Sequence, residues 1–194
     1  MSGAGHGHGA EGHGSAENKR IALLISVLAL FLALSETLGK SAQTTGLDKN
    51  IEASNLWSFF QAKTIRMTVL RTATESAELE LAQITTPKAK EALEQRIAGW
   101  RKSAERYDSE PETREGRKEL AARAKDAEKI RDRSLAAYHH YELASAGLQI
   151  AIVLASASIV TGILVLAWAA IGLGVVGVIF CGIGFFAPFS VHLF

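Results

Sequence analysis

The distribution of charge along the chain constrains its fold more than any other feature of the sequence. The last Asp, Glu, Lys or Arg is Glu142, and residues 143–194 carry no formal charge and are strongly apolar. Most of the charge lies between Lys40 and Glu142 instead. An uncharged apolar segment of this length is typical of a chain that crosses a bilayer. The sequence therefore predicts an all-α integral membrane protein that carries a separate polar domain.

Composition and motifs argue against several classes of function. The formal net charge of the 194 residues is +1, so no strongly basic surface is available and nucleic acid is not expected as a partner. The single cysteine, Cys181, lies in the apolar region and excludes an intrachain disulfide or a cysteine-rich metal site. No nucleophile–base arrangement, phosphate-binding loop or pair of catalytic carboxylates stands out. We therefore expect a protein that is not an enzyme.

The first apolar segment predicts a transmembrane helix over residues 19–39. Lys19 and Arg20 precede an apolar run at residues 21–34. A spanning helix needs about 20 residues, so the span extends past this run and places Glu36 near the membrane surface. Basic residues followed by a short apolar run also fit a signal peptide. We interpret the segment as an uncleaved helix that follows a disordered tail, residues 1–18.

The closing region, residues 147–194, predicts a transmembrane hairpin. Its helices are expected at about residues 147–168 and 171–187, joined at Ala169 and Ala170. In lipid there is little hydrophobic drive to pair helices, so small side chains that allow close backbone approach supply the contact. We expect this packing within a subunit or between subunits. One row of small residues recurs at intervals of three and four from the end of the first of these helices through the second: Ala167, Ala170, Gly174, Gly177, Cys181 and Gly184.

The polar domain, residues 40–146, predicts three helices at about residues 47–84, 87–107 and 112–146. Pro87 and Pro111 mark the two breaks. Apolar residues in the first helix alternate at intervals of three and four, a spacing that indicates a coiled-coil seam, and such a seam suits a homo-oligomer. The seam is interrupted by Lys63 and Thr74, and its apolar members are Leu56, Phe60, Met67, Leu70, Ala77, Leu81 and Ile84.

One motif carries a family resemblance. Residues 50–66 read NIEASNLWSFFQAKTIR. This segment, within the order of tail, apolar helix, charged helices and apolar hairpin, resembles the bacterial family described as domain of unknown function 4337. The resemblance covers nearly the whole chain from Lys19. It implies a bacterial inner-membrane protein and implies no activity.

Aromatic and charged residues near the predicted span ends suggest membrane-interface positions. Tyr138 and Tyr141 precede the uncharged region, where amphipathic rings anchor a helix among headgroups. Glu36 and Lys40 are four residues apart and favour an interfacial ion pair over a proton relay. A further group of residues comprises Trp57, Phe59, Phe60 and Lys63. Two interpretations of this group remain open. It is a dock for lipid or a partner, with Lys63 near lipid phosphate, or it is part of the coiled-coil seam.

The histidines of the tail suggest a weak metal site. His6, His8 and His13 lie among glycines, so three neutral imidazoles can converge on one Zn²⁺, Ni²⁺ or Cu²⁺ ion. Nothing nearby fixes the rings, so the binding would be weak. A solvated linker that contains histidine is the favoured interpretation, and we expect no other cofactor.

The positive-inside rule weakly favours a cytoplasmic polar domain. Lys19 and Arg20 lie on the tail side, against five cations near the spans on the domain side: Lys40, Lys49, Lys129, Arg131 and Arg133. The sequence thus predicts a non-enzymatic, homo-oligomeric scaffold or assembly subunit of the inner membrane. Its expected partners are membrane lipids, further copies of the chain and, as an option, another membrane protein. The alternatives are a channel or transport component with a pore formed by several subunits, and a metal-responsive protein that uses the tail.

Overall fold

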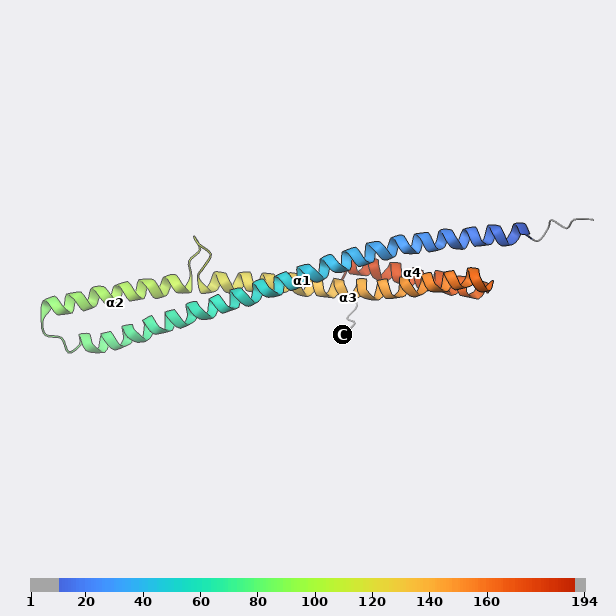
Figure 1. Cartoon of the computed structure of the whole chain (residues 1–194). Helices are drawn as coiled ribbons and strands as arrows, with labels where there is room; N and C mark the ends of the chain where they lie inside the picture. The colour runs from blue at the N-terminus through green and yellow to red at the C-terminus, as the bar shows by residue number, and fades with distance from the viewer. Residues whose placement is uncertain (1–10, 191–194) are drawn as a thin grey trace, which may run out of the picture. The chain divides into compact units, whose positions relative to one another are not determined.

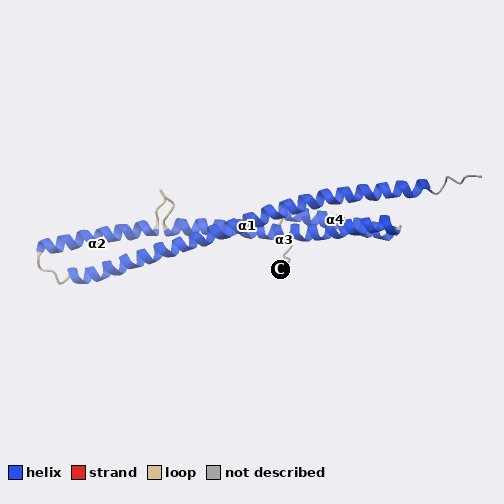
Figure 2. Cartoon of the chain, viewed as in Figure 1, coloured by secondary structure: helices blue, strands red, loops and turns tan. Residues whose placement is uncertain are grey.

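The computed structural model describes residues 11–190, with side chains described from residue 17 onward. This part of the chain contains helices and loops but no strand, which confirms the all-α prediction (Figure 2). Helices α1, α3 and α4 are long and apolar enough to cross a membrane. The four helices in chain order are α1 (Glu11–Leu81), α2 (Pro87–Asp108), α3 (Arg117–Thr161) and α4 (Leu164–Phe186) (Figure 1).

Helix α1 is continuous over 71 residues, where the sequence predicted two helices, 19–39 and 47–84. The two glycines of the expected break serve close packing. A Cβ added at Gly39 would lie 3.2 Å from Tyr141 Cβ, and one at Gly46 would lie 2.8 Å from Leu135 Cδ2, both on α3. Helix α1 begins at Glu11, within the segment predicted as the tail, residues 1–18.

The connections around α2 lie close to the two prolines. Pro87 occupies the start of α2, where its missing N–H costs nothing. Thr86 before it is extended and forms no side-chain cap. Helix α3 begins at Arg117, later than the predicted start at residue 112. The intervening loop, residues 109–116, contributes side chains to the candidate functional site.

The turn between α3 and α4 lies at Gly162 and not at Ala169 and Ala170, which are inside α4. Gly162 has φ +71°, the left-handed conformation that glycine adopts at helix ends. Its N–H donates to Ser158 O at 2.9 Å, and the Ser158 hydroxyl donates to Ile163 O at 3.0 Å. The predicted helix 147–168 therefore ends early, at Thr161.

The chain divides into two compact units. Unit 1 comprises Met1–Gly46 and Asp132–Phe194, and unit 2 comprises Leu47–Arg131. Helices α1 and α3 contribute to both. The core of unit 2 is Leu56, Leu120 and Ala124, with Trp57 and Phe60 packed against it. The core of unit 1 is formed by Ile21, Leu28, Leu148, Ala151, Ala155, Ala167 and Ala170.

Candidate functional site

Lys63 is the centre of the most concentrated chemistry in unit 2. Its side chain is only 7% exposed, although it belongs to the solvent-facing polar region of the sequence. Nζ lies 3.9 Å from Glu110 Oε2 and 4.0 Å from Glu115 Oε2. The same atom lies 5.2 Å from the ring centroids of Phe59 and Tyr107. The ammonium is therefore enclosed by two carboxylates and two aromatic faces, which stabilise its charge.

A second set of contacts fastens the loop at residues 109–116. Glu119 accepts hydrogen bonds from the Ser109 hydroxyl at 2.6 Å and from the Glu110 N–H at 3.1 Å. Asp108 pairs with Lys118 at 2.8 Å. The Ser109 hydrogen bond, with that of the Glu110 N–H, lowers the pKa of Glu119, and the Lys118 hydrogen bond lowers the pKa of Asp108. Both carboxylates therefore hold the loop in their ionised form.

Arg117 joins this loop to α1. Its guanidinium carbon lies 5.2 Å from the ring centroid of Phe60, and Nη1 lies 3.4 Å from Met67 Sδ and 3.8 Å from Asp108 Oδ1. Its buried Nε has no hydrogen-bond partner. We call the whole arrangement the loop clamp: Phe59, Lys63, Tyr107, Asp108, Ser109, Glu110, Glu115, Arg117, Lys118 and Glu119.

The predicted seam of α1 is occupied within the chain itself. Leu56 and Met67 are buried, while Phe60 and Leu70 are partly buried. Leu56 packs with α3 residues in the core of unit 2. These four residues are therefore already covered, at least in part, and the surface for a partner has to be sought elsewhere on α1.

The structure bears on the two interpretations of Trp57, Phe59, Phe60 and Lys63, which are a dock for lipid or a partner and part of the coiled-coil seam. Trp57 Nε1 donates to Glu128 Oε1 at 2.8 Å, and the Trp57 ring meets Phe60 edge to face at 5.4 Å. Lys63 is buried among carboxylates, so its ammonium is not presented to lipid phosphate. Only Phe59 remains substantially exposed. These contacts favour the seam interpretation over a lipid dock.

Four of the six residues predicted for the membrane interface meet in unit 1, whereas Trp57 and Phe59 lie in unit 2. A cavity of about 320 Å³ between α1 and α3 is lined by Glu36, Lys40, Tyr138 and Tyr141, among others. Glu36 accepts a hydrogen bond from Gln149 at 3.1 Å and is not paired with Lys40. Tyr141 is buried, so it packs inside the unit, whereas Tyr138 is partly exposed.

The small residues of α4 lie against α1 and α3 within the same chain. A Cβ at Gly174 would come 2.5 Å from Leu28 Cδ2 on α1, and one at Gly177 would come 2.9 Å from Leu148 Cγ on α3. A Cβ at Gly184 would meet Ala137 O at 3.2 Å. Cys181 is a partly buried free thiol in this row. This row of glycines therefore supplies close helix packing inside unit 1.

Sequence reasoning missed several polar residues. Most residues of the loop clamp lie in the segment 108–119. From the sequence alone, this segment is expected to be a solvated charged break between helices. His140 is 1% exposed, and its Nε2 lies 3.1 Å from Pro188 O. Its ring stacks on Phe180 with centroids 6.1 Å apart. The available signal was the position of His140 between Tyr138 and Tyr141, just before the uncharged apolar region.

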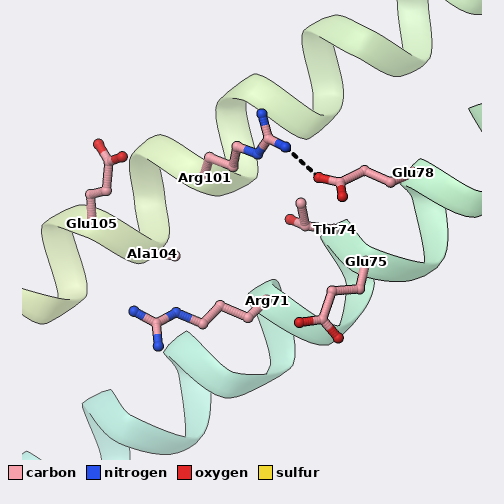
Figure 3. A pocket seen from close by; sticks show the side chains of 7 residues that line it. All are labelled: Arg71, Thr74, Glu75, Glu78, Arg101, Ala104 and Glu105. Atoms are coloured by element: carbon pink, nitrogen blue, oxygen red, sulfur yellow. Dashed lines mark hydrogen bonds and ion pairs between the residues drawn. The ribbon is translucent and has the colours of Figure 1, made fainter.

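A second polar cavity, of about 360 Å³, lies between α1 and α2 in unit 2 (Figure 3). Arg101 pairs with Glu78 across it, and the buried Thr74 forms part of its wall. Its other lining residues are Arg71, Glu75, Ala104 and Glu105. Two arginines and three glutamates alternate here, so the arrangement resembles an ion-pair seam more than a pocket for one ligand charge.

The predicted metal ligands fall at the edge of the structure. His6 and His8 lie outside the described residues, and His13 lies in α1 at a position whose side chain is not described. Among the described residues, no group of three or more His, Cys, Asp or Glu side chains is arranged to hold a metal ion.

These observations define an all-helical protein with three helices able, by length and composition, to cross a membrane. A family model described as domain of unknown function (DUF4337) matches residues 17–187, and the chain belongs to this family. The match confirms the resemblance carried by residues 50–66. No curated protein and no solved structure matches the chain.

Proposed function

We propose that the protein is a non-enzymatic, homo-oligomeric scaffold or assembly subunit of the bacterial inner membrane. One observation carries the proposal: α1 exposes a row of large aliphatic residues in the polar unit 2. Five of them, Leu47, Ile51, Ile65, Val69 and Leu79, are between 56% and 74% exposed. These residues recur on one face of a helix in a charged region, and exposed apolar residues gathered on one face mark an interaction site more often than scattered ones do.

The loop clamp supports a structural role. A nucleophilic or proton-transferring lysine needs a path for substrate to its amine. Lys63 is instead enclosed by Phe59, Tyr107 and two carboxylates, with 7% of its side chain exposed. Its charge is used to hold the loop at residues 109–116 against α1. The strongest charged cluster of unit 2 therefore stabilises the fold.

Membrane insertion follows from the three apolar helices. Helix α4 has 23 residues, or about 34 Å of helix, which matches a hydrocarbon core of about 30 Å. Lipids are then obligatory partners of unit 1. The excess of cations near the spans on the side of unit 2 favours a cytoplasmic position for that unit.

The test is the molecular mass of the purified full-length chain, measured by light scattering in two detergents and again in lipid nanodiscs. A scaffold that self-associates gives a defined multiple of 20.8 kDa in all three conditions. A monomer throughout would contradict the proposal. A defined oligomer that also conducts ions in reconstituted vesicles would contradict the scaffold and favour a channel component.

A further inference from the structure

Ten residues of α1 form an exposed, uncharged line along unit 2. Each is exposed, and successive members are three or four residues apart, so they lie on one side of the helix. None carries a charge, although charged residues occur throughout the rest of this segment. We call this line the outer stripe: Leu47, Ile51, Ser54, Ser58, Ala62, Ile65, Val69, Thr72, Ser76 and Leu79.

The outer stripe lies opposite the contacts that build unit 2. The buried α1 residues in this unit include Leu56, Lys63 and Met67. Leu56 follows Leu47 by two and a half turns at 3.6 residues per turn, so the two point in opposite directions. Helices α2 and α3 pack on the buried side. The outer stripe is thus left uncovered by the chain itself.

We propose that the outer stripe is the seam along which α1 of a second copy of this chain docks, parallel and in register. This inference rests on the proposed self-association and names the surface that produces it. The three-and-four spacing is what a second helix requires. Pairs of large aliphatic side chains are separated by runs of two or three small ones, which let two helices approach closely between the aliphatic contacts.

Four of the five large aliphatic residues fit a two-stranded parallel arrangement. When Leu47 and Leu79 are placed at heptad position d, with one four-residue step between Ser58 and Ala62, the β-branched Ile51 and Val69 fall at position a and Ile65 falls at position d. β-Branched residues at a with leucine at d favour parallel dimers. The extra step changes the supercoil locally without moving the stripe off its face.

The Ser58 hydroxyl at the middle of the stripe can be covered at little cost. Ser58 Oγ donates to the Ser54 carbonyl at 2.9 Å, within its own helix. A hydroxyl that is already hydrogen-bonded does not lose a partner when a second helix displaces water. In unit 1, Ser26 Oγ donates to Ala22 O at 3.0 Å in the same manner.

A second row in unit 1 supports a copy of the chain as the occupant. Ala22, Ser26, Ala29 and Ala33 are exposed on α1 at intervals of four, three and four. Such small-residue spacing favours helix contacts in lipid. Two copies inserted in one membrane enter with the same polarity, so their α1 helices run parallel. We call these four residues the membrane row. A soluble partner has no transmembrane helix that could pair with it.

The size of the outer stripe is sufficient for a specific contact. From Leu47 to Leu79 the helix runs about 48 Å, and it is about 10 Å wide. Pairing along that length buries on the order of 500 Å² per copy, or about 1,000 Å² in total, which reaches the lower end of specific interfaces. The membrane row would add to it.

Disulfide trapping in membranes tests the seam. In a Cys181→Ser background, Ser58→Cys and Ser76→Cys should each form disulfide-linked dimers in more than half of the chains under mild oxidation. Ser103→Cys, exposed on α2 and away from the stripe, is the matched control and should give at least fivefold less. Equal trapping at Ser103, or trapping of Ser58→Cys alone, would overturn parallel in-register pairing.

The mass of stripe variants separates this inference from the proposed function. Ile65→Glu with Val69→Glu should weaken dimerisation at least 100-fold while leaving helicity unchanged. Ala98→Glu, exposed on α2, should leave it within threefold. An oligomer that persists in the stripe variant overturns the seam but keeps the scaffold. A wild-type chain that is monomeric overturns both.

Discussion

Units 1 and 2 share helices α1 and α3, yet they differ in the smallest residues that α1 buries. Both units bury large apolar residues of α1, such as Leu28 in unit 1 and Leu56 and Met67 in unit 2, but only unit 1 also buries glycines of this helix, Gly39 and Gly46. In water, large apolar side chains stabilise a fold by leaving solvent. Under the proposed insertion of unit 1 in lipid, that gain is absent there, so close contact over small residues replaces it. The proposed difference in solvent therefore accounts for the glycines that α1 buries in unit 1 alone.

The two units also satisfy their buried polar groups differently. In unit 1, the hydroxyls of Ser35 and Ser158 donate to backbone carbonyls, and His140 Nε2 does the same to Pro188 O. In unit 2, the buried Lys63 is neutralised by carboxylate side chains. A backbone carbonyl has a second lone pair and can accept such a hydrogen bond without any charge, whereas ionised partners are tolerated only near water.

The largest effect is expected from filling the glycine row of unit 1. Gly177→Leu would drive a side chain into Leu148 and Ala144 O, and we expect a loss of more than about 3 kcal/mol. Denaturation in mixed detergent micelles, followed by circular dichroism, measures it. Gly172→Leu is the matched control, because nothing lies within 4 Å of its added Cβ. Equal losses in the two variants would refute close packing as the stabilising contact.

The next effect concerns the loop clamp of unit 2. Lys63→Met keeps the length of the side chain but leaves Glu110 and Glu115 without this cation, and we expect a loss of about 2–3 kcal/mol. Glu115 is half exposed and Glu110 retains Arg106, which keeps the loss moderate. Hydrogen exchange of the amides of residues 109–116 should accelerate first. Lys49→Met, which removes a local pair with Glu52, should change stability by less than about 0.5 kcal/mol.

A smaller effect should appear when acid is added. Asp108 and Glu119 have pKa values lowered from ordinary values of 3.8 and 4.5. A group with a lowered folded-state pKa contributes stability above its unfolded pKa and loses it as the pH falls through the folded value. The loop at residues 109–116 should therefore open below about pH 4, while unit 1 stays closed.

Hydrogen exchange corrected for intrinsic rates would follow this opening peptide by peptide. Glu119→Gln removes one of the two titrating groups, so its loop should exchange faster at neutral pH and respond less to acid. A loop in Glu119→Gln that shows the wild-type pH dependence would mean that Glu119 has no part in the acid response.

Sequence reasoning captured the helical class, the family and the small residues of α4, because each depends on local spacing or composition. It missed the continuity of α1, since Gly39 and Gly46 look like a break until the side chains of Tyr141 and Leu135 are seen above them. It also missed the loop clamp. Its members are brought together by tertiary contacts between α1 and a loop about 50 residues later, which no local period encodes.

The smallest expected effects come from replacing Gly162 and Gly99 with alanine. The test is whether the two substitutions change stability in opposite directions. Gly162→Ala would place a Cβ in a left-handed residue, at a cost of about 1 kcal/mol. Gly99 is also a glycine with nothing within 4 Å of an added Cβ, but it lies inside α2. Gly99→Ala should therefore stabilise unit 2 by about 0.5–1 kcal/mol, since alanine loses less backbone entropy in a helix. Unfolding midpoints that move in the same direction for both substitutions would show that Gly162 does not require its backbone conformation.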